Sequence, residues 1–193
     1  MYNSINVSGR KISCIAIGVS AGGMKALITI LESIGKDFPV PILITQHLHK
    51  SSDSFHLIFL DKKCNLIVKE AENFEPIKKG HVYFAPVDYH LLVESDKSFM
   101  LSYEEKVRYS RPSIDVMFES VSEVFQDELL GIVLTGANDD GTYGVKVIKE
   151  NGGITIAQEP ATSEFPAMPQ FAIDSGYVDY VMSLEEINKK IFK

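Results

Sequence analysis

Strand-like and helix-like segments alternate along most of this chain of 193 residues, and this alternation restricts the fold more than any other feature. Short apolar runs are separated by helical stretches of roughly ten residues, a spacing typical of strand–helix–strand units. Strands connected in this way run parallel, and their helices pack on the sheet. We therefore predict a three-layer α/β fold, a mostly parallel sheet with helices on both faces. The expected strands are residues 11–18, 40–46, 66–70, 81–85, 129–135, 154–157 and 178–182.

The helices are expected between these strands. Ser51 or Ser52 is a candidate N-cap for a helix that ends near residue 62, and Ser113 is the expected N-cap of another. The sequence from Ser183 to Glu186 is a capping box that begins a last helix. The other expected helices are residues 23–34, 113–126, 144–150 and 169–175, and the expected antiparallel hairpin pairs residues 91–94 with 99–103.

The composition predicts one globular domain that spans residues 1–193, with a flexible segment at residues 1–10. The net charge of −7 argues against nonspecific nucleic-acid binding and against attraction to an anionic membrane. No apolar run approaches the ~18 residues of a membrane span, and the first residues lack the apolar centre of a signal peptide. We therefore expect a cytoplasmic protein without membrane insertion. Cys14 and Cys64 belong to no CxxC pair, so we expect neither a metal site nor a disulfide, and Cys14 is expected to be buried.

The turn after the first strand places a serine between glycines, in the sequence Gly18-Val19-Ser20-Ala21-Gly22. Glycines allow a sharp turn that lifts the serine hydroxyl above the end of the sheet, which is the setting of an esterase nucleophile. The first backbone amides of the following helix then lie near any oxyanion that forms there. The alternative is an ordinary strand-to-helix turn in which Ser20 caps the helix.

Three strand ends carry residues that together could form a catalytic triad. The first ends at Ser20, the second runs into His47, and the strand near residues 131–135 ends at a loop with Asp139 and Asp140. Sites of open parallel sheets lie outside the carboxyl ends of the strands. A hydroxyl, an imidazole and a carboxylate at one edge have the composition of a serine-hydrolase triad. The residues alone do not choose between the two aspartates, and the rivals of His47 as the base are His49, His56, His81 and His90.

A dinucleotide site is the other class of function that the same turn suggests. Gly18, Ser20 and Gly23 have the spacing of a G-x-G-x-x-G fingerprint, but serine replaces the middle glycine, which lets a pyrophosphate approach the backbone. The acidic residue expected after the second strand is also missing, since that strand ends in Gln46-His47. This alternative is therefore the weaker one.

With these residues assembled, the chain resembles the catalytic domain of the chemotaxis protein-glutamate methylesterase family, CheB. The resemblance extends from about residue 12 to residue 181. Each block is weak alone, but all of them in this order are highly specific. The blocks are Ala16-Ile17-Gly18-Val19-Ser20-Ala21-Gly22-Gly23, Ile44-Thr45-Gln46-His47, Tyr83-Phe84-Ala85-Pro86 with His90, Arg111-Pro112-Ser113-Ile114-Asp115-Val116, Leu134-Thr135-Gly136 through Asp140-Gly141, and Gln158-Glu159-Pro160 through Met168-Pro169.

The resemblance implies roles for individual residues. Ser20 matches the nucleophile of the family, His47 its base and Asp140 its triad acid. Backbone amides of Ala21 and Ala137 are the expected oxyanion donors. The mechanism requires neither a metal nor an organic cofactor. The expected cleft or substrate contacts are Gly22, Gly23, Arg111, Met168 and His90, although ordering a loop is an equal alternative for Arg111, and structural roles are equal alternatives for Met168 and His90.

The loop and the turn also depart from the family pattern. Ala21 replaces a frequent threonine, Ala137 a usual methionine and Asn138 a usual glycine. Asparagine is acceptable there because it reaches left-handed backbone conformations more easily than most residues. Family members commonly carry an N-terminal receiver domain, which we do not expect in this chain. It is expected to be a freestanding catalytic domain or a piece of a longer protein.

The resemblance implies hydrolysis of glutamate γ-methyl esters on the cytoplasmic helices of chemoreceptors, through an acyl-enzyme, and deamidation of receptor glutamines at the same site. The expected partners are the chemoreceptor (methyl-accepting chemotaxis protein) and a separate receiver domain or other signalling protein. Two alternatives remain: an esterase or amidase with another substrate, and a non-catalytic binding module of the same fold.

Overall fold

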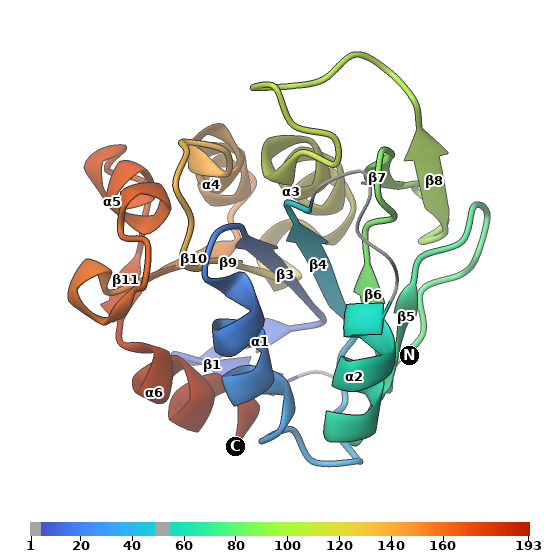
Figure 1. Ribbon diagram of the computed structural model, residues 1–193, viewed down its shortest axis with the longest axis horizontal. Helices are drawn as coiled ribbons and strands as arrows, with labels where there is room; N and C mark the ends of the chain where they lie inside the picture. The colour runs from blue at the N-terminus through green and yellow to red at the C-terminus, as the bar shows by residue number, and fades with distance from the viewer. Residues whose placement is uncertain (1–4, 49–54) are drawn as a thin grey trace.

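In the computed structural model, which describes residues 5–48 and 55–193, seven strands form one sheet in the order β11-β10-β9-β3-β4-β6-β5 (Figure 1). All neighbouring strands in this sheet run parallel, which confirms the predicted fold class. Their bounds are β3 Cys14–Val19, β4 Ile42–Gln46, β5 Ile67–Glu70, β6 His81–Phe84, β9 Leu129–Val133, β10 Ile154–Gln158 and β11 Tyr180–Met182.

Two antiparallel hairpins accompany the sheet. The predicted one pairs β7 (His90–Val93) with β8 (Phe99–Ser102). The other pairs β1 (Ile5–Val7) with β2 (Arg10–Ile12), so the segment expected to be flexible contains a strand. The single strand expected at residues 11–18 is also interrupted, because Ser13 leaves the ladder and donates its N–H to the carbonyl of Glu128 at 2.8 Å.

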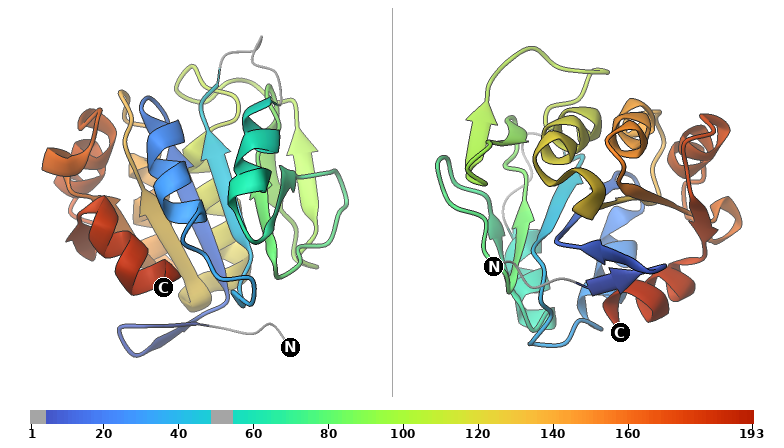
Figure 2. Two further views of the ribbon diagram at one scale, coloured as in Figure 1. Left: turned by 60° about the horizontal axis from the view of Figure 1, so that its bottom comes forward. Right: turned by 180° about the vertical axis from the view of Figure 1, so that it is seen from behind.

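The helices cover both faces of the sheet (Figure 2). Helices α1 (Gly23–Leu31), α2 (Phe55–Lys63) and α6 (Leu184–Ile187) pack on one face, where they share a core with the side chains of that face. On the opposite face lie α3 (Ile114–Phe125), α4 (Thr142–Glu150) and α5 (Ala167–Asp174), together with the β7–β8 hairpin. A five-residue π-helical turn, Asn188–Phe192, continues α6, and short 3₁₀ turns lie at Gln126–Glu128 and Pro160–Thr162.

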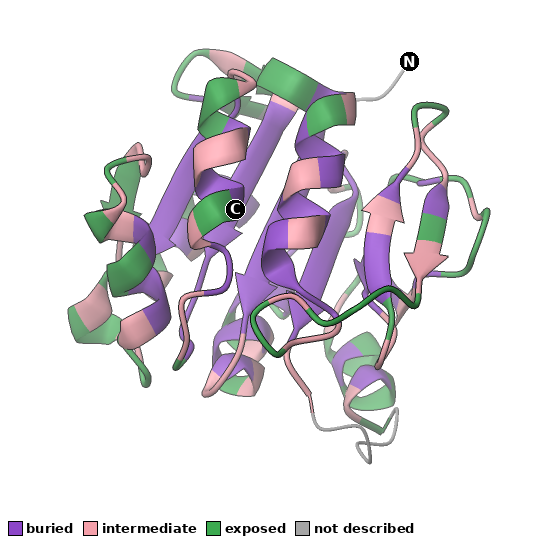
Figure 3. Cartoon of the chain, turned by 90° about the horizontal axis from the view of Figure 1, so that it is seen from above, coloured by how far each residue is buried: buried purple, intermediate pink, exposed green. Residues whose placement is uncertain are grey.

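The sheet is buried by these two helical layers (Figure 3). Every residue of β3, β4, β9 and β10 is buried, which explains why these strands are continuous apolar runs without alternation in the sequence. Each fully buried Val, Leu or Ile side chain contributes about 1.5–3 kcal/mol relative to an exposed one. The central strands therefore form the rigid part on which the loops at their carboxyl ends are mounted.

The helix ends follow the predicted capping residues where the structure describes them. Ser113 accepts a hydrogen bond from the N–H of Val116 at 3.5 Å as the N-cap of α3. Ser183 and Glu186 form the predicted capping box of α6. The cap predicted at Ser51 or Ser52 lies outside the described residues.

Some boundaries differ from those predicted. Helix α1 ends at Leu31 instead of residue 34, α4 begins two residues early at Thr142, and α5 begins two residues early at Ala167. Helices α1 and α4 are preceded by Gly22 (φ 74°) and Gly141 (φ 98°), both in the left-handed region that favours glycine. No helix in residues 5–48 and 55–193 is long and apolar enough to cross a membrane.

The strand order determines where a site can form. The chain leaves β3 toward β4 on one side and later returns to place β9 on the other side of β3. Helix α1 follows β3 on one face, and α4 follows β9 on the other. The crevice between β3 and β9 is thus a topological switch point, where open α/β sheets bind their ligands.

Candidate active site

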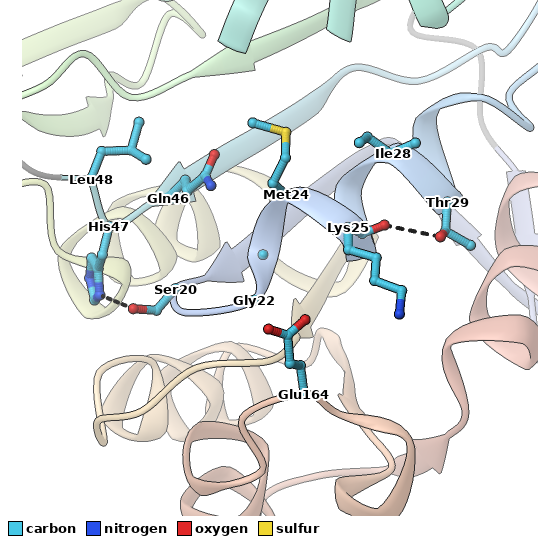
Figure 4. A pocket seen from close by; sticks show the side chains of 11 residues that line it. Ser20, Gly22, Met24, Lys25, Ile28, Thr29, Gln46, His47, Leu48 and Glu164 are labelled. Carbon is cyan, nitrogen blue, oxygen red and sulfur yellow. Dashed lines mark hydrogen bonds between the residues drawn. The ribbon is translucent and has the colours of Figure 1, made fainter. Parts of the chain in front are cut away.

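Ser20 lies at the switch point, in the turn between β3 and α1. Its N–H donates to the carbonyl of Thr135 at 3.0 Å, and its own carbonyl accepts from the N–H of Gly23 at 3.0 Å. A Cβ at Gly23 would lie 2.5 Å from Cγ2 of Val19, so this glycine permits the helix to start directly against the strand. The turn therefore fixes the serine at the end of the central strand, with its hydroxyl toward a cleft (Figure 4).

His47 directly follows β4, the strand next to β3. Its backbone N–H donates to the carbonyl of Val19 at 3.1 Å, which continues the ladder between the two strands. Its Nδ1 lies 3.2 Å from Oγ of Ser20, the contact drawn in Figure 4. Its Nε2 lies 2.8 Å from Oδ2 of Asp140, and the imidazole is 13% exposed. One ring thus connects the hydroxyl after β3 to the carboxylate after β9.

Asp140 is completely buried at the N-terminus of α3 and receives four hydrogen bonds. Oδ1 accepts from the hydroxyl of Ser113 at 3.0 Å and from the N–H of Asp115 at 2.9 Å. Oδ2 accepts from His47 and from the N–H of Ile114 at 2.8 Å. Burial alone would raise the pKa of Asp140, but the hydrogen bonds from His47 and from the two backbone N–H groups lower it below its ordinary value. The carboxylate is therefore ionised at neutral pH.

The hydrogen bonds around Asp140 also determine the tautomer of His47. An ionised carboxylate only accepts, so Nε2 of His47 carries the proton and donates it. The lone pair of Nδ1 is then available to accept the hydroxyl hydrogen of Ser20. A neutral imidazole oriented in this way can take a proton from the serine hydroxyl.

A second carboxylate, Asp115, lies in the first turn of α3, beside the N–H groups of that helix that Asp140 caps. Its Oδ1 accepts from the N–H groups of Gly141 and Gly144 at 2.9 and 2.7 Å, which caps α4. Its Oδ2 accepts from Nε of Arg108 at 3.0 Å. Burial, followed by the nearby charge of Asp140, raises the pKa of Asp115. The two helices are therefore capped reciprocally, since Asp140 precedes α4 and caps α3, whereas Asp115 belongs to α3 and caps α4.

The cleft next to Ser20 has a volume of about 530 Å³ and extends along α1. Gly22 and Gly23 line it, and so do Lys25 and Glu164. Figure 4 shows Gly22, Lys25 and Glu164 around this cleft. A second hollow of about 290 Å³ opens on the other side of His47 and is lined by Lys106, Tyr109 and Arg111, among others. A third, apolar hollow of about 300 Å³ lies between Ala137 and α5.

Arg111 orders its own loop. Its Nε and Nη2 donate to Oδ1 of Asp88 at 3.1 and 2.9 Å, and its Nη1 donates to the carbonyls of Tyr103 and Glu104 at 3.1 and 2.7 Å. The guanidinium also stacks on the ring of Tyr103 at 3.7 Å. Of the two roles considered for Arg111, the loop-ordering one corresponds to these contacts, although its side chain also lines the hollow beside His47.

Met168 and His90 are not among the residues that line the cleft, so of the two roles considered for each, the structural one corresponds to their contacts. Met168 is fully buried, because its side chain packs against Gly136, where an added Cβ would lie 2.6 Å from its sulfur. His90 is 2% exposed and bridges two backbone groups. Its Nδ1 accepts from the N–H of Ser113 at 3.2 Å, and its Nε2 donates to the carbonyl of Glu105 at 3.0 Å. Both residues have structural roles beneath the loops of the site.

The rival residues lie elsewhere. The ring of His56 contacts that of Phe84, and the ring of His81 stacks on that of Tyr83, away from Ser20. His49 lies outside the described residues. Asp139 forms an ion pair with Arg108 at the surface. Of the two aspartates, the structure therefore brings Asp140 to the imidazole.

Ala21, the residue after Ser20, and Ala137, in the loop after β9, carry the two backbone amides expected to bind an oxyanion. Within the described part of the chain, neither N–H donates to a protein acceptor, so both are available to a bound oxygen. The carbonyl of Ala21 accepts from the hydroxyl of Thr135 at 2.9 Å, which ties the Ser20 turn to the end of β9. Thr135 also accepts from the N–H of Phe165 at 2.9 Å. Across residues 5–48 and 55–193, no group of three or more His, Cys, Asp or Glu side chains is arranged to hold a metal ion.

The contacts of Arg108 and the capping roles of Asp115 were not predicted from the sequence. Only a backbone property was predicted for Asn138, but Asn138 does not have a positive φ, so the left-handed argument does not apply to it. Its Nδ2 lies 3.4 Å from Nδ1 of His47. The place of this side chain two residues before Asp140 is the signal in the sequence that points to such a contact.

A parallel sheet between two helical layers, with a Ser–His–Asp contact at its switch point, is an arrangement typical of a hydrolase. The CheB methylesterase family matches residues 15–191. A Leptospira interrogans relative is 54% identical over 173 residues, which are 90% of this chain and 90% of that protein. A Clostridium acetobutylicum protein-glutamate methylesterase/protein-glutamine glutaminase is 35% identical over 97% of this chain, which spans 54% of that protein's length.

The crystal structure of the Thermotoga maritima CheB methylesterase catalytic domain superposes on this fold with a TM-score of 0.89. It is 34% identical in sequence, and the match covers 94% of this chain and 97% of that one. The chain therefore belongs to the CheB methylesterase family, and it is an enzyme, a carboxylic ester hydrolase.

Proposed function

We propose that this enzyme hydrolyses glutamate γ-methyl esters on the cytoplasmic helices of chemoreceptors, with Ser20, His47 and Asp140 as its catalytic triad. The observation that carries the proposal is the continuous contact from Oγ of Ser20 through the imidazole to the carboxylate, at 3.2 and 2.8 Å. The names of relatives such as the Clostridium acetobutylicum protein supply the substrate class.

The first half of the reaction forms an acyl-enzyme. His47 accepts the hydroxyl proton of Ser20 on Nδ1 while Oγ attacks the ester carbonyl. Asp140 holds the ring and stabilises the imidazolium through Nε2–H. The tetrahedral intermediate collapses when Nδ1 returns the proton to the methoxide oxygen, and methanol leaves.

The second half consumes water. His47 takes a proton from a water molecule that attacks the acyl carbon, and the second collapse frees the glutamate carboxylate and restores Ser20. The N–H groups of Ala21 and Ala137 bind the oxyanion in both halves, and each such donor contributes on the order of 3 kcal/mol by analogy with subtilisin. Side-chain chemistry and backbone amides are sufficient for this reaction, so we propose that it uses no cofactor.

The same acyl-enzyme permits deamidation of receptor glutamines, in which ammonia leaves in place of methanol. The relatives named as glutaminases support this second activity. We propose that the protein works in the cytoplasm in chemotaxis adaptation and that a separate receiver domain or other signalling protein regulates it.

Methanol release from methylated receptor membranes tests the proposal. Ser20→Ala and His47→Ala should each lose roughly 10⁶-fold in kcat if the triad acts as one unit, as in subtilisin. Ser102→Ala, in the distant β8 strand, and His81→Ala serve as matched controls and should retain activity. A Ser20→Ala protein with wild-type activity would refute the triad.

Substrate choice needs a separate assay. Turnover of methylated receptor, glutamine-containing receptor and small methyl esters should be compared with one enzyme preparation. If small esters react well and the receptor does not, the enzyme is an esterase with another substrate. If a serine-directed phosphonate fails to label Ser20, the fold serves as a binding module.

A further inference from the structure

Asn138 lies beside the nitrogen of His47 that faces Ser20. Its Nδ2 is 3.4 Å from Nδ1 of the imidazole, and Oγ of Ser20 is 3.2 Å from the same atom. The carbonyl oxygen of the amide, Oδ1, is buried and has no hydrogen-bond partner among the described residues. A buried oxygen without a donor is unfavourable, so its retention next to the imidazole requires an explanation.

The protonation of His47 changes which end of the amide it can bind. A neutral Nδ1 has one lone pair, and the hydroxyl of Ser20 and the amide of Asn138 compete for it. After Nδ1 has taken the serine proton, it becomes a donor and needs an acceptor. The oxygen and nitrogen of a carboxamide have nearly the same shape, so rotation of the amide about Cβ–Cγ presents Oδ1 in place of Nδ2 without new space.

We propose that Asn138 is a positioning residue that holds the protonated ring of His47 by accepting Nδ1–H with its Oδ1. Asp140 accepts Nε2–H at the same time, so both donors of the imidazolium are satisfied. The proton remains on Nδ1 until it passes to the leaving oxygen. Asn138 takes no proton at any step. This role rests on the proposed function and adds a residue to it.

The role depends on the side chain of Asn138, because the glycine usual at this position in the loop pattern that the chain resembles has no group to offer the imidazole. The backbone of Asn138 lies outside the left-handed region, so backbone conformation does not account for an asparagine. Asp140 on the same loop is fixed by four hydrogen bonds, which also places Asn138 against the ring.

A neutral substitution at Asn138 tests the contact between its amide and the ring of His47 without changing any charge near that ring. The charged groups around His47 are Asp140 at Nε2, Lys106 and Arg111 in one hollow, and Lys25 and Glu164 in the cleft. Asn138→Leu has nearly the same shape and alters none of them. Any displacement of its pH–rate profile therefore comes from the lost amide.

The kinetic test compares wild type, Asn138→Leu and Asn138→Asp in methanol release from methylated receptor. Asn138→Leu should lose roughly 10–100-fold in kcat, the range for one hydrogen bond to a charged group, while KM stays the same. The acid limb of its profile should move to lower pH. Asn138→Asp keeps an acceptor and should recover most of kcat, with its acid limb at higher pH than that of the wild type. A purely structural role predicts that the two variants lose activity equally and that the neutral variant Asn138→Leu keeps the wild-type limb.

A spectroscopic test does not require turnover. In ¹⁵N-labelled Ser20→Ala protein at low pH, Asn138 is the remaining acceptor for Nδ1–H of His47, and this proton should give a slowly exchanging NMR signal. The signal should disappear in Ser20→Ala/Asn138→Leu and persist in Ser20→Ala/Asn73→Leu, where the exposed Asn73 bonds only to the distant N–H of Leu101. Persistence in the Asn138→Leu protein would overturn the inference. If wild type releases no methanol, the proposed function fails, and this experiment still decides the contact.

Discussion

Replacement of Asp140 by asparagine should be far milder than its replacement by alanine, and the structure indicates why. The new amide has one oxygen and one NH₂ group to divide between four donors. The Oδ1 position faces the hydroxyl of Ser113, which can turn and accept, whereas the Oδ2 position faces His47 and the N–H of Ile114. The NH₂ group should therefore occupy the Oδ1 position, and the oxygen should keep the imidazole in its tautomer.

The magnitudes follow from the bonds that each variant loses. In Asp140→Asn, the buried N–H of Asp115 loses its acceptor, which costs about 1–3 kcal/mol. Asp140→Ala leaves His47 and two backbone N–H groups without an acceptor, which costs about 3–5 kcal/mol, comparable to removal of one partner from a buried pair. For a chain of this size, 1 kcal/mol corresponds to about 2–4 °C in Tm. The expected falls in Tm are thus about 2–12 °C for asparagine and about 6–20 °C for alanine.

The kcat values of the two variants should differ in the same order as their stabilities, with the larger loss in Asp140→Ala. Asp140→Ala should lose roughly 10⁴-fold in kcat, as removal of the acid does in a comparable triad. Asp140→Asn keeps the tautomer but loses the charge and the bond to the N–H of Asp115, so a loss of roughly 10–100-fold is expected. Methanol release and thermal unfolding of both variants check these values, and Asp139→Asn is the matched control. The additional change Ser113→Ala should remove the preference of the new NH₂ group for the Oδ1 position, so the double variant should lose more kcat than Asp140→Asn alone. Equal losses in Asp140→Asn and Asp140→Ala would refute the reasoning.

Three further outcomes are expected. The pKa of Asp115 is raised in the folded protein, so ionisation of this carboxyl opposes folding. The free energy of unfolding of the wild type, compared with that of Asp115→Asn, should therefore be most favourable below the ordinary carboxyl pKa of about 3.9. This difference should shrink as the pH rises toward 7, which urea unfolding measures. Gly144→Ala would place a Cβ 2.6 Å from Cβ of Phe118, so thermal unfolding should report a loss of about 1–3 kcal/mol. Burial raises the pKa of the thiols of Cys14 and Cys64, so a disulfide reagent at pH 7 should label the half-buried Cys64 slowly and Cys14 only after unfolding; rapid labelling of Cys14 would contradict its burial.

The strong elements of the fold were predictable because they are buried on both faces. Strands such as β3 and β9 are continuous apolar runs, and a parallel sheet between helical layers produces that pattern. The break at Ser13 was not predictable, because it depends on a bond to Glu128, more than a hundred residues away. The burial of Met168 was not predictable for the same reason, because it depends on the packing of this side chain against Gly136, which is distant in the sequence.

In the site, too, the residues placed by local sequence pattern were predictable, and those placed by distant contacts were not. Ser20 and His47 end strands, so their position at the edge of the sheet follows from local pattern and strand direction. The distinction between Asp139 and Asp140 does not, because it depends on which side chain meets the N-terminus of α3. Only the resemblance to a known family chose between them in the sequence, and the contact at 2.8 Å now distinguishes them physically.

The reciprocal caps give a physical reason for the position of Asp140, the proposed triad acid. Asp140 satisfies the first N–H groups of α3, and Asp115 satisfies those of α4, so each carboxylate holds the other helix. A helix N-terminus favours a negative charge, which offsets the burial of Asp140 and keeps it ionised beside His47. Asp140 is thereby attached to two helices that pack on one face of the sheet, whereas Ser20 precedes a helix on the other face. The alignment of the proposed triad thus depends on the packing of both layers against the central strands, and a core substitution that shifts α3 against α4 should reduce kcat even where it touches no residue of the site.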